Sequence, residues 1–258
     1  MSMNNAIRDW RAQRVWLLGA STGIGAALAT ALLTRGARVA VSARRAQLLE
    51  QVIAPFDARQ CCALPLDVRD ADSVARAEQA LSASWGGYDL VVVLAGDYQS
   101  HILAEFNLAS ARHILDTNLG GVYNVLAAVV PRLRAARAGG LVLVSSVAGY
   151  RGLPRSLVYG PSKAALNNLA EALYLELKDD NVAVSLVNPG FVRTPLTAHN
   201  PFPMPAIIEA PAAAEAIIAG LERGAFEIHF PRRFTWVMKA LALLPAALYL
   251  PLMRWLTR

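Results

Sequence analysis

A tyrosine and a lysine stand four residues apart at the start of a segment with a helical pattern. Tyr159 and Lys163 belong to the stretch VYGPSKAALNNLAEALYLEL, residues 158–177. Side chains at positions i and i+4 share one face of a helix, so the phenol and the ammonium group can act on the same point in space. This spacing can tune the acidity of the phenol.

A glycine-rich turn follows the first apolar run of the chain. Gly19, Gly23 and Gly25 have the spacing G-x-x-x-G-x-G in the stretch LLGASTGIGAALA. Glycines permit a tight turn, and the helix that follows offers N–H donors and the positive end of its dipole to a pyrophosphate. The pattern indicates a phosphate-binding turn, and the alternative is a strand-to-helix connection that binds no nucleotide.

Arginines follow the second apolar run where NAD-binding folds place an acidic residue. That acid lies about 20 residues beyond the glycines and binds the ribose hydroxyls of NAD. Here VAVSARR supplies Arg44 and Arg45 instead, and guanidinium groups suit a 2′-phosphate. We expect NADP(H) to be preferred over NAD(H), and the alternative is a pair of solvated arginines at the start of a helix.

Short apolar runs alternate with longer helical patterns along most of the chain. Strands are predicted at 15–18, 39–41, 63–66, 90–94, 141–145 and 182–187. Helices are predicted at 24–35, 45–54, 71–84, 110–135, 160–178 and 211–222. Apolar strands between helices are typical of a parallel sheet covered on both faces. We therefore expect an α/β fold with a doubly wound, mostly parallel sheet between two helical layers, a Rossmann fold.

The composition restricts the class of protein. The chain has 258 residues, of which 55% are hydrophobic and 17% charged. We expect one domain at 1–230, extended by an apolar segment at 231–258. No uncharged run is long enough to cross a bilayer, and the first residues lack the apolar stretch of a secretory signal, so a cytoplasmic location is expected.

Metal and nucleic acid are not expected as ligands. Cys61 and Cys62 are adjacent and the four histidines show no ligand spacing, so no metal site is predicted. The net charge of +6 comes almost entirely from five basic residues after Glu227, since the rest of the chain has 20 basic and 19 acidic side chains. A basic surface for nucleic acid is therefore missing from the main part of the chain.

Further motifs make a specific resemblance. Ser146 precedes Tyr159 by thirteen residues, Asn118 lies in DTNLGGVYN, and NPGFVRT occupies 188–194. Together with the glycine turn and Y-x-x-x-K, these motifs follow the order found in the short-chain dehydrogenase/reductase family. The resemblance extends from about Val15 to Thr194.

The resemblance implies roles for four residues. Tyr159 would be the general acid or base at the carbonyl or alcohol oxygen. Lys163 would bind the nicotinamide ribose, and its charge together with that of the oxidised nicotinamide would lower the pKa of the phenol. Ser146 would hydrogen-bond the substrate oxygen, and Asn118 would order a water that relays protons to Lys163. Taken singly, Ser146 and Asn118 also fit a turn residue and a helix-interior amide.

The resemblance also implies a set of cofactor-binding residues. Thr194 and the backbone of Val192 would hold the carboxamide, and Asp67, which alone also fits a helix cap, would contact the adenine. The complete set is Gly19, Ser21, Thr22, Gly23, Ile24, Gly25, Arg44, Arg45, Asp67, Val68, Ala95, Gly96, Tyr159, Lys163, Pro189, Gly190, Val192 and Thr194.

The chain departs from the family pattern at one strand end. Where the family has N-N-A-G, this sequence has Val93, Leu94, Ala95 and Gly96. The asparagine amides that join neighbouring strands are absent, so altered hydrogen bonding is expected there. Ala95 and Gly96 still allow the cofactor to approach closely.

Two segments lie outside the family motifs. Residues 194–211 have five prolines and several apolar side chains, and predict a long functional loop for a hydrophobic ketone, aldehyde or secondary alcohol. The tail has 14 uncharged residues at 240–253 between basic residues, and Pro245 and Pro251 are expected to interrupt any helix. A lid or a subunit interface is one interpretation of the tail, and peripheral contact with a membrane surface is the other.

These observations lead to one leading function and two alternatives. The leading function is an oxidoreductase that transfers a hydride between NADP(H) and a hydrophobic carbonyl or alcohol. The alternatives are a non-catalytic NADP-binding regulator on the same fold and a membrane-surface protein that acts through its tail. The resemblance also implies a homodimer or homotetramer.

Overall fold

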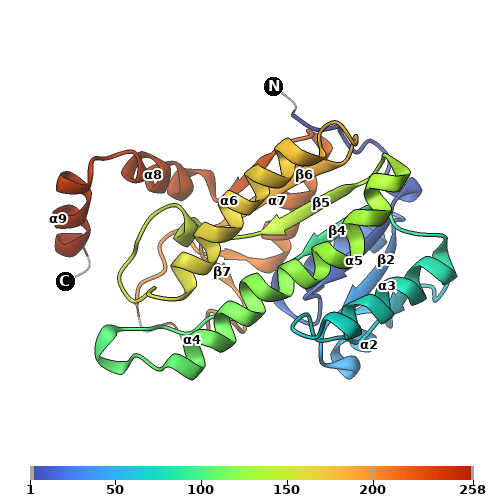
Figure 1. Ribbon diagram of the computed structural model, residues 1–258, viewed down its shortest axis with the longest axis horizontal. Helices are drawn as coiled ribbons and strands as arrows, with labels where there is room; N and C mark the ends of the chain where they lie inside the picture. The colour runs from blue at the N-terminus through green and yellow to red at the C-terminus, as the bar shows by residue number, and fades with distance from the viewer. Residues whose placement is uncertain (1–2, 199, 201, 257–258) are drawn as a thin grey trace.

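A parallel sheet forms the centre of the computed structural model, which describes residues 3–198, 200 and 202–256 (Figure 1). Within these residues the sheet has seven strands in the order β3-β2-β1-β4-β5-β6-β9, and each neighbouring pair is parallel. The strands are β1 (Arg14–Leu18), β2 (Arg38–Ser42), β3 (Cys61–Ala63), β4 (Leu90–Val93), β5 (Gly140–Val144), β6 (Ala183–Pro189) and β9 (Glu227–Phe230).

Helices cover both faces of the sheet. One face packs against α1 (Gly23–Thr34), α2 (Ala46–Ile53) and α7 (Ala210–Glu222). The other packs against α3 (Ala71–Trp85), α5 (Gly121–Ala136) and α6 (Tyr159–Leu177). This arrangement confirms the predicted three-layer Rossmann fold.

Strand β1 shows why the strands read as continuous apolar runs. Val15 and Leu17 pack into one core and Trp16 and Leu18 into the other. Successive side chains of a strand point to opposite faces, so a strand covered on both sides has no polar alternation.

The third strand lies two residues earlier than predicted. It spans Cys61–Ala63, whereas the sequence predicted 63–66. Pro65 has no N–H for a sheet hydrogen bond, which disfavours a strand through this position. Cys61 and Cys62 belong to the strand and pack into opposite cores, so their side chains lie on opposite faces of the sheet.

The predicted helix at 110–135 is divided into three parts. Helix α4 (Leu108–Leu115) begins at Asn107, whose side chain accepts a hydrogen bond from the N–H of Ser110. A π-helical segment, Asp116–Gly120, follows and leads into α5. Such π segments often occur at functional sites because they reorient side chains within a helix.

The C-terminal segment forms two helices that extend from the sheet (Figure 1). They are α8 (Arg232–Ala242) and α9 (Ala246–Leu256). Pro245 separates them as expected, but Pro251 lies inside α9. Strand β9, which the sequence did not predict, leads directly into α8.

The remaining elements are short. Strands β7 (Val192–Arg193) and β8 (Ile208–Glu209) pair at the base of the predicted substrate loop, of which residues 199 and 201 lie outside the described part. Short 3-10 helices span Trp10–Ala12, Leu103–Glu105 and Val147–Gly149. Among the described residues, none of the helices combines the length and the apolar character that a membrane span requires.

Candidate active site

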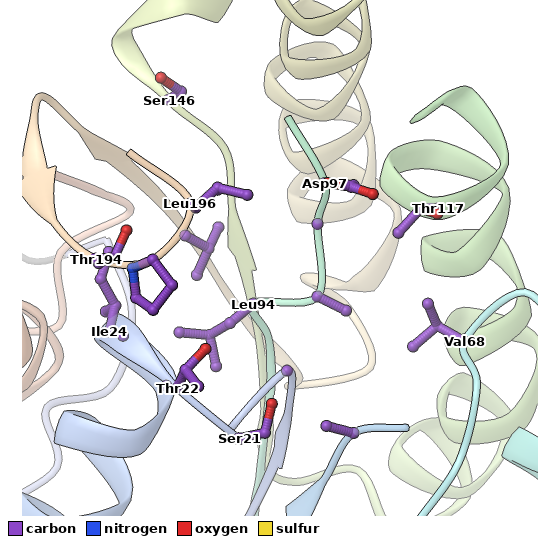
Figure 2. A pocket seen from close by; sticks show the side chains of 18 of the residues that line it. Ser21, Thr22, Ile24, Val68, Leu94, Asp97, Thr117, Ser146, Thr194 and Leu196 are labelled. Atoms are coloured by element: carbon purple, nitrogen blue, oxygen red, sulfur yellow. The ribbon is translucent and has the colours of Figure 1, made fainter. Parts of the chain in front are cut away.

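A cleft of about 430 Å³ opens at the carboxyl ends of the strands. In parallel α/β sheets this edge is the usual place for a ligand. All eighteen residues of the predicted cofactor set line the cleft. Figure 2 shows how its walls are built: Ser21, Thr22 and Ile24 lie on one side of Leu94, and Val68 and Thr117 on the other.

The glycine turn is closed around the end of β4. Gly19 has φ +98°, and a Cβ placed on it would lie 2.5 Å from the backbone nitrogen of Ala95. A Cβ on Gly25 would collide with the carbonyl oxygen of Gly19. Both positions therefore require glycine for the backbone to reach this conformation.

The amino end of α1 faces this cleft with free donors. Its N-cap residue, Thr22, makes no side-chain capping hydrogen bond. The first N–H groups of a helix have no partner within the helix, and together with the helix dipole they favour an anion. The turn thus fits the pyrophosphate of a dinucleotide.

Two arginines lie at the outer end of the cleft. Arg44 and Arg45 are exposed cleft residues, and Arg45 donates to Ser21 Oγ at 3.3 Å. These guanidinium groups fit a phosphate on the adenosine ribose.

The predicted adenine contact, Asp67, is held by a residue that the sequence analysis missed. Arg69 pairs with it at 2.6 Å and lowers the pKa of its carboxyl. Arg69 also lies 3.1 Å from His113 Nδ1, and His113 Nε2 lies 3.1 Å from Asp97 Oδ2. This connects the adenine end to Asp97, deeper in the cleft. Only the fold brings these four residues together, so no spacing in the sequence could have indicated it.

Ser146, Tyr159 and Lys163 meet at the inner end of the cleft. Ser146 follows β5, and its Oγ accepts from the N–H of Ala148 at 3.1 Å and hydrogen-bonds Tyr159. Tyr159 begins α6. Lys163, one turn later, is buried and donates from Nζ to Val144 O at 2.9 Å. Its Nζ lies 5.7 Å from the centre of the Tyr159 ring.

Burial determines the acidity of these two groups. It raises the pKa of Tyr159 to about 12, and the hydrogen bond from Ser146 opposes this only in part. It lowers the pKa of Lys163 to about 8. In the protein alone the pKa of Tyr159 is therefore raised, because removal from water disfavours both charged forms. The lowering of this pKa by Lys163 together with the oxidised nicotinamide stays a prediction.

Asn118 lies just behind the cleft in the π-helical segment and is fully buried. Its Oδ1 accepts from the N–H of Asp97 at 2.7 Å, and its Nδ2 donates to Asp97 O and Ser162 Oγ. The side chain therefore fixes the turn that follows β4 and joins it to α6.

The departure from N-N-A-G gives the cleft an apolar side chain. Leu94 donates its backbone N–H to Leu18 O at 2.8 Å, so β4 stays joined to β1 without an asparagine amide. Its side chain projects between the glycine turn and Thr194 (Figure 2).

The far wall of the cleft is formed by the segment after β6. Thr194 lies against the glycine turn, with its Cγ2 3.0 Å from a Cβ placed on Gly23. Thr197, which the sequence analysis missed, donates to Val192 O at 2.7 Å and also contacts Thr194. Leu196 lines the cleft beside them.

This combination of fold and site defines a dinucleotide-binding α/β protein, and the comparisons give its family. The profile of the family described as "short chain dehydrogenase" matches residues 13–201. The chain belongs to the short-chain dehydrogenase family and is an oxidoreductase of that type.

Similar proteins agree with this assignment. An uncharacterized oxidoreductase of Myxococcus xanthus (strain DK1622) is 38% identical over 233 residues, which are 90% of this chain and 92% of that protein. A short-chain dehydrogenase from Burkholderia cenocepacia J2315, solved in complex with NADP, has a TM-score of 0.82 at 27% identity, over 95% of this chain and 99% of that chain. A short-chain dehydrogenase from Streptomyces avermitilis has a TM-score of 0.79 at 25% identity, over 95% and 97%.

Proposed function

We propose that the protein transfers a hydride between NADP(H) and a hydrophobic ketone, aldehyde or secondary alcohol, with Tyr159 as general acid and base. The observation that carries this proposal is the arrangement of one cleft. Arg44 and Arg45 lie at its outer end, and Ser146, Tyr159 and Lys163 lie at its inner end. The NADP bound to the similar Burkholderia enzyme supports the choice of cofactor.

Each residue at the inner end has a distinct task in this reaction. NADPH would supply the hydride to the carbonyl carbon. Tyr159 gives its phenolic proton to the carbonyl oxygen, which Ser146 holds by a hydrogen bond. The raised pKa of Tyr159 keeps the phenol protonated and ready to donate at neutral pH.

Lys163 has a pKa of about 8, so it exchanges protons near neutral pH and returns one to Tyr159. Its ammonium group would also bind the ribose hydroxyls. Asn118 acts on this site through the backbone of Asp97, which its side chain holds in place. A water bound at Asn118 would then complete the path of the proton.

The lining of the cleft favours an apolar substrate. Four charged lining residues, Arg44, Arg45, Asp67 and Arg69, gather at the adenosine end. The other two are engaged within the protein, because Asp97 lies within hydrogen-bond distance of His113 and Lys163 donates to Val144 O. Leu94 and Leu196 supply apolar surface, and an apolar pocket with few placed polar groups suits an uncharged carbonyl compound.

We also propose that the chain forms one domain and assembles as a homodimer or homotetramer. Contacts from α8 and α9 to residues 150–152 support a single domain that includes the tail. Tyr123 on α5 and Leu175 on α6 are 53% and 73% exposed. Burial of these helix faces against a second copy would remove that apolar surface from water.

The reaction is tested with NADPH deuterated at the transferred position and a panel of apolar ketones and aldehydes. Mass spectrometry should find one deuterium on the carbinol carbon of the product. Tyr159→Phe should lower kcat by about 10²- to 10⁴-fold, because the proton donor is lost, while NADPH still binds. Tyr174→Phe, on the same helix with its hydroxyl bonded to Met3 O, is the matched control and should retain activity.

NADPH binding by the wild type without transfer of deuterium to any member of the panel would support the non-catalytic regulator instead. Equal activity of wild type and Tyr159→Phe would remove the tyrosine from the proposed mechanism.

A further inference from the structure

The two C-terminal helices, here called the arm (residues 232–256), expose an unusual share of apolar side chains. Of the sixteen large hydrophobic residues exposed among the described residues, seven lie in the arm. They include Trp236 at 60% exposure, Leu243 at 86% and Trp255 at 71%. Single exposed apolar residues are ordinary on a protein surface, but a concentrated group of them marks an interaction site.

The charge of the arm has one sign. No acidic residue follows Glu227 in the sequence. Lys239 pairs with Glu227 at 2.5 Å, and so its charge is compensated. Arg232, Arg233 and Arg254 are exposed, and no acidic side chain of the described residues forms an ion pair with them. The arm therefore presents apolar side chains together with uncompensated positive charge.

Specific contacts hold the arm against the rest of the protein. Arg151 donates to the carbonyl oxygens of Ala242 and Leu244, and its guanidinium lies 4.1 Å from the centre of the Tyr249 ring. Tyr249 in turn donates to Gly152 O at 2.8 Å. These contacts fix which side of the arm faces the protein, and the seven apolar side chains remain exposed on the sides that the contacts do not cover.

We propose that the arm docks this protein on an anionic lipid surface. Trp and Leu side chains favour the boundary between headgroups and acyl chains, and basic side chains are attracted to anionic headgroups. Each arm helix has 11 residues and is about 16 Å long, against a hydrocarbon core of about 30 Å. The arm can therefore lie in the interface but cannot cross it.

The charge also decides against a second copy of the chain as the occupant. A symmetric contact between two arms would bring Arg232, Arg233 and Arg254 of both copies together with no acidic residue of the arm to offset them. Like charges in a contact are unfavourable. An anionic surface supplies the missing opposite charge.

The segment that holds the arm also connects residues of the predicted catalytic site. Arg151 and Gly152, which hold the arm, lie in the chain between Ser146 and Tyr159. The lipid surface would therefore lie next to the segment between Ser146 and Tyr159, two of the four predicted catalytic residues. If the proposed function holds, an apolar substrate could reach the site from the lipid; the docking itself does not depend on that function.

The test is co-sedimentation with vesicles of phosphatidylcholine alone and of phosphatidylcholine with phosphatidylglycerol. The full-length protein should bind the anionic vesicles and bind the neutral ones much more weakly. Arg232→Glu with Arg233→Glu should weaken binding to anionic vesicles by at least about thirtyfold, because each basic residue near such a surface contributes about 1 kcal/mol.

The matched control is Arg8→Glu with Arg223→Glu, which changes the net charge by the same amount. Both residues are exposed at the opposite end of the sheet, where Ile7 bonds Leu221 O and Arg223 precedes β9. This variant should bind nearly as well as the wild type. Leu243→Ser should weaken binding by about tenfold. Leu103→Ser, at a leucine outside the arm with comparable exposure (81% against 86%), should not weaken it.

Cooperative thermal unfolding of each variant shows that it is folded, without reference to nucleotide or substrate. Failure of the wild type to bind anionic vesicles would overturn the proposal. So would equal weakening by the arm variants and their controls. If the arm variants instead change the oligomeric state measured by sedimentation and no protein binds vesicles, the arm is a contact between copies of the chain.

Discussion

The glycine turn of the cleft and the segment that holds the arm differ in how closely the backbone packs. On the cofactor side, a Cβ at Gly19 would lie 2.5 Å from the backbone of Ala95. In the segment that holds the arm, a Cβ at Gly152 would have no neighbour within 4 Å, although this residue bonds the arm through its carbonyl oxygen.

This difference in backbone packing follows from what each of the two regions binds. A pyrophosphate is bound largely by backbone N–H groups, so the backbone itself must approach the ligand, and only glycine permits that. Gly152 instead lies in an exposed loop, and loops tolerate changes in sequence. The glycine turn therefore needs residues of fixed type, whereas the loop at Gly152 has room for a side chain.

Replacement of glycine by alanine, which adds one methyl group, should show this difference in backbone packing most strongly. Gly19→Ala should destabilise the protein by about 2 to 5 kcal/mol, because Ala is strained at positive φ and its Cβ meets the Ala95 backbone. Gly152→Ala should change the stability by less than about 1 kcal/mol. Denaturant unfolding of both variants gives these values, and a similar cost at both sites would contradict the comparison.

The next largest effect on stability is expected from Lys163, the buried lysine at the inner end of the cleft. The pKa of Lys163 is about 8 in the folded protein and 10.5 ordinarily. Between these two pH values, the unfolded chain binds more protons at Lys163 than the folded protein does. Stability contributed by this group therefore rises with pH across that window. From about pH 7 to about pH 10, the wild type should gain about 2 to 3 kcal/mol relative to Lys163→Met.

Subtraction of the two pH profiles removes the titrations that both proteins share. The measurement should end near pH 10, because Tyr159, with its pKa raised from 10.0 to about 12, makes the folded protein lose stability at higher pH. Parallel profiles for the two proteins would show that Lys163 is not desolvated as the structure indicates.

The sequence was sufficient for six of the seven strands of the sheet and for the position of the glycine turn. Buried parallel strands appear as continuous apolar runs, and the turn at Gly19 and Gly25 needs its residue types for backbone reasons alone. The spacing of Tyr159 and Lys163 likewise follows from helix geometry. These are local properties, which a short stretch of sequence contains in full.

The remaining features depend on contacts between distant residues. The pKa of Tyr159 in the protein alone is raised by burial, which a short stretch of sequence does not show. The pairing of Asp97 with His113 and the anchoring of the arm by Arg151 join segments that only the fold brings together. Strand β9 was missed because it is short and contains Glu227 and His229, so it lacks an apolar run.

The central claim is that this cleft binds NADP(H), and its most direct test is the dissociation constants of NADPH and NADH by fluorescence titration. The wild type should bind NADPH more tightly, and Arg44→Ala with Arg45→Ala should lose about tenfold to hundredfold in NADPH affinity, because charge-assisted hydrogen bonds to the 2′-phosphate are removed. NADH affinity should change little, and Arg8→Ala with Arg223→Ala should leave both values unchanged. Absence of binding for either nucleotide, or an equal loss for both in the Arg44 and Arg45 variant, would contradict the account.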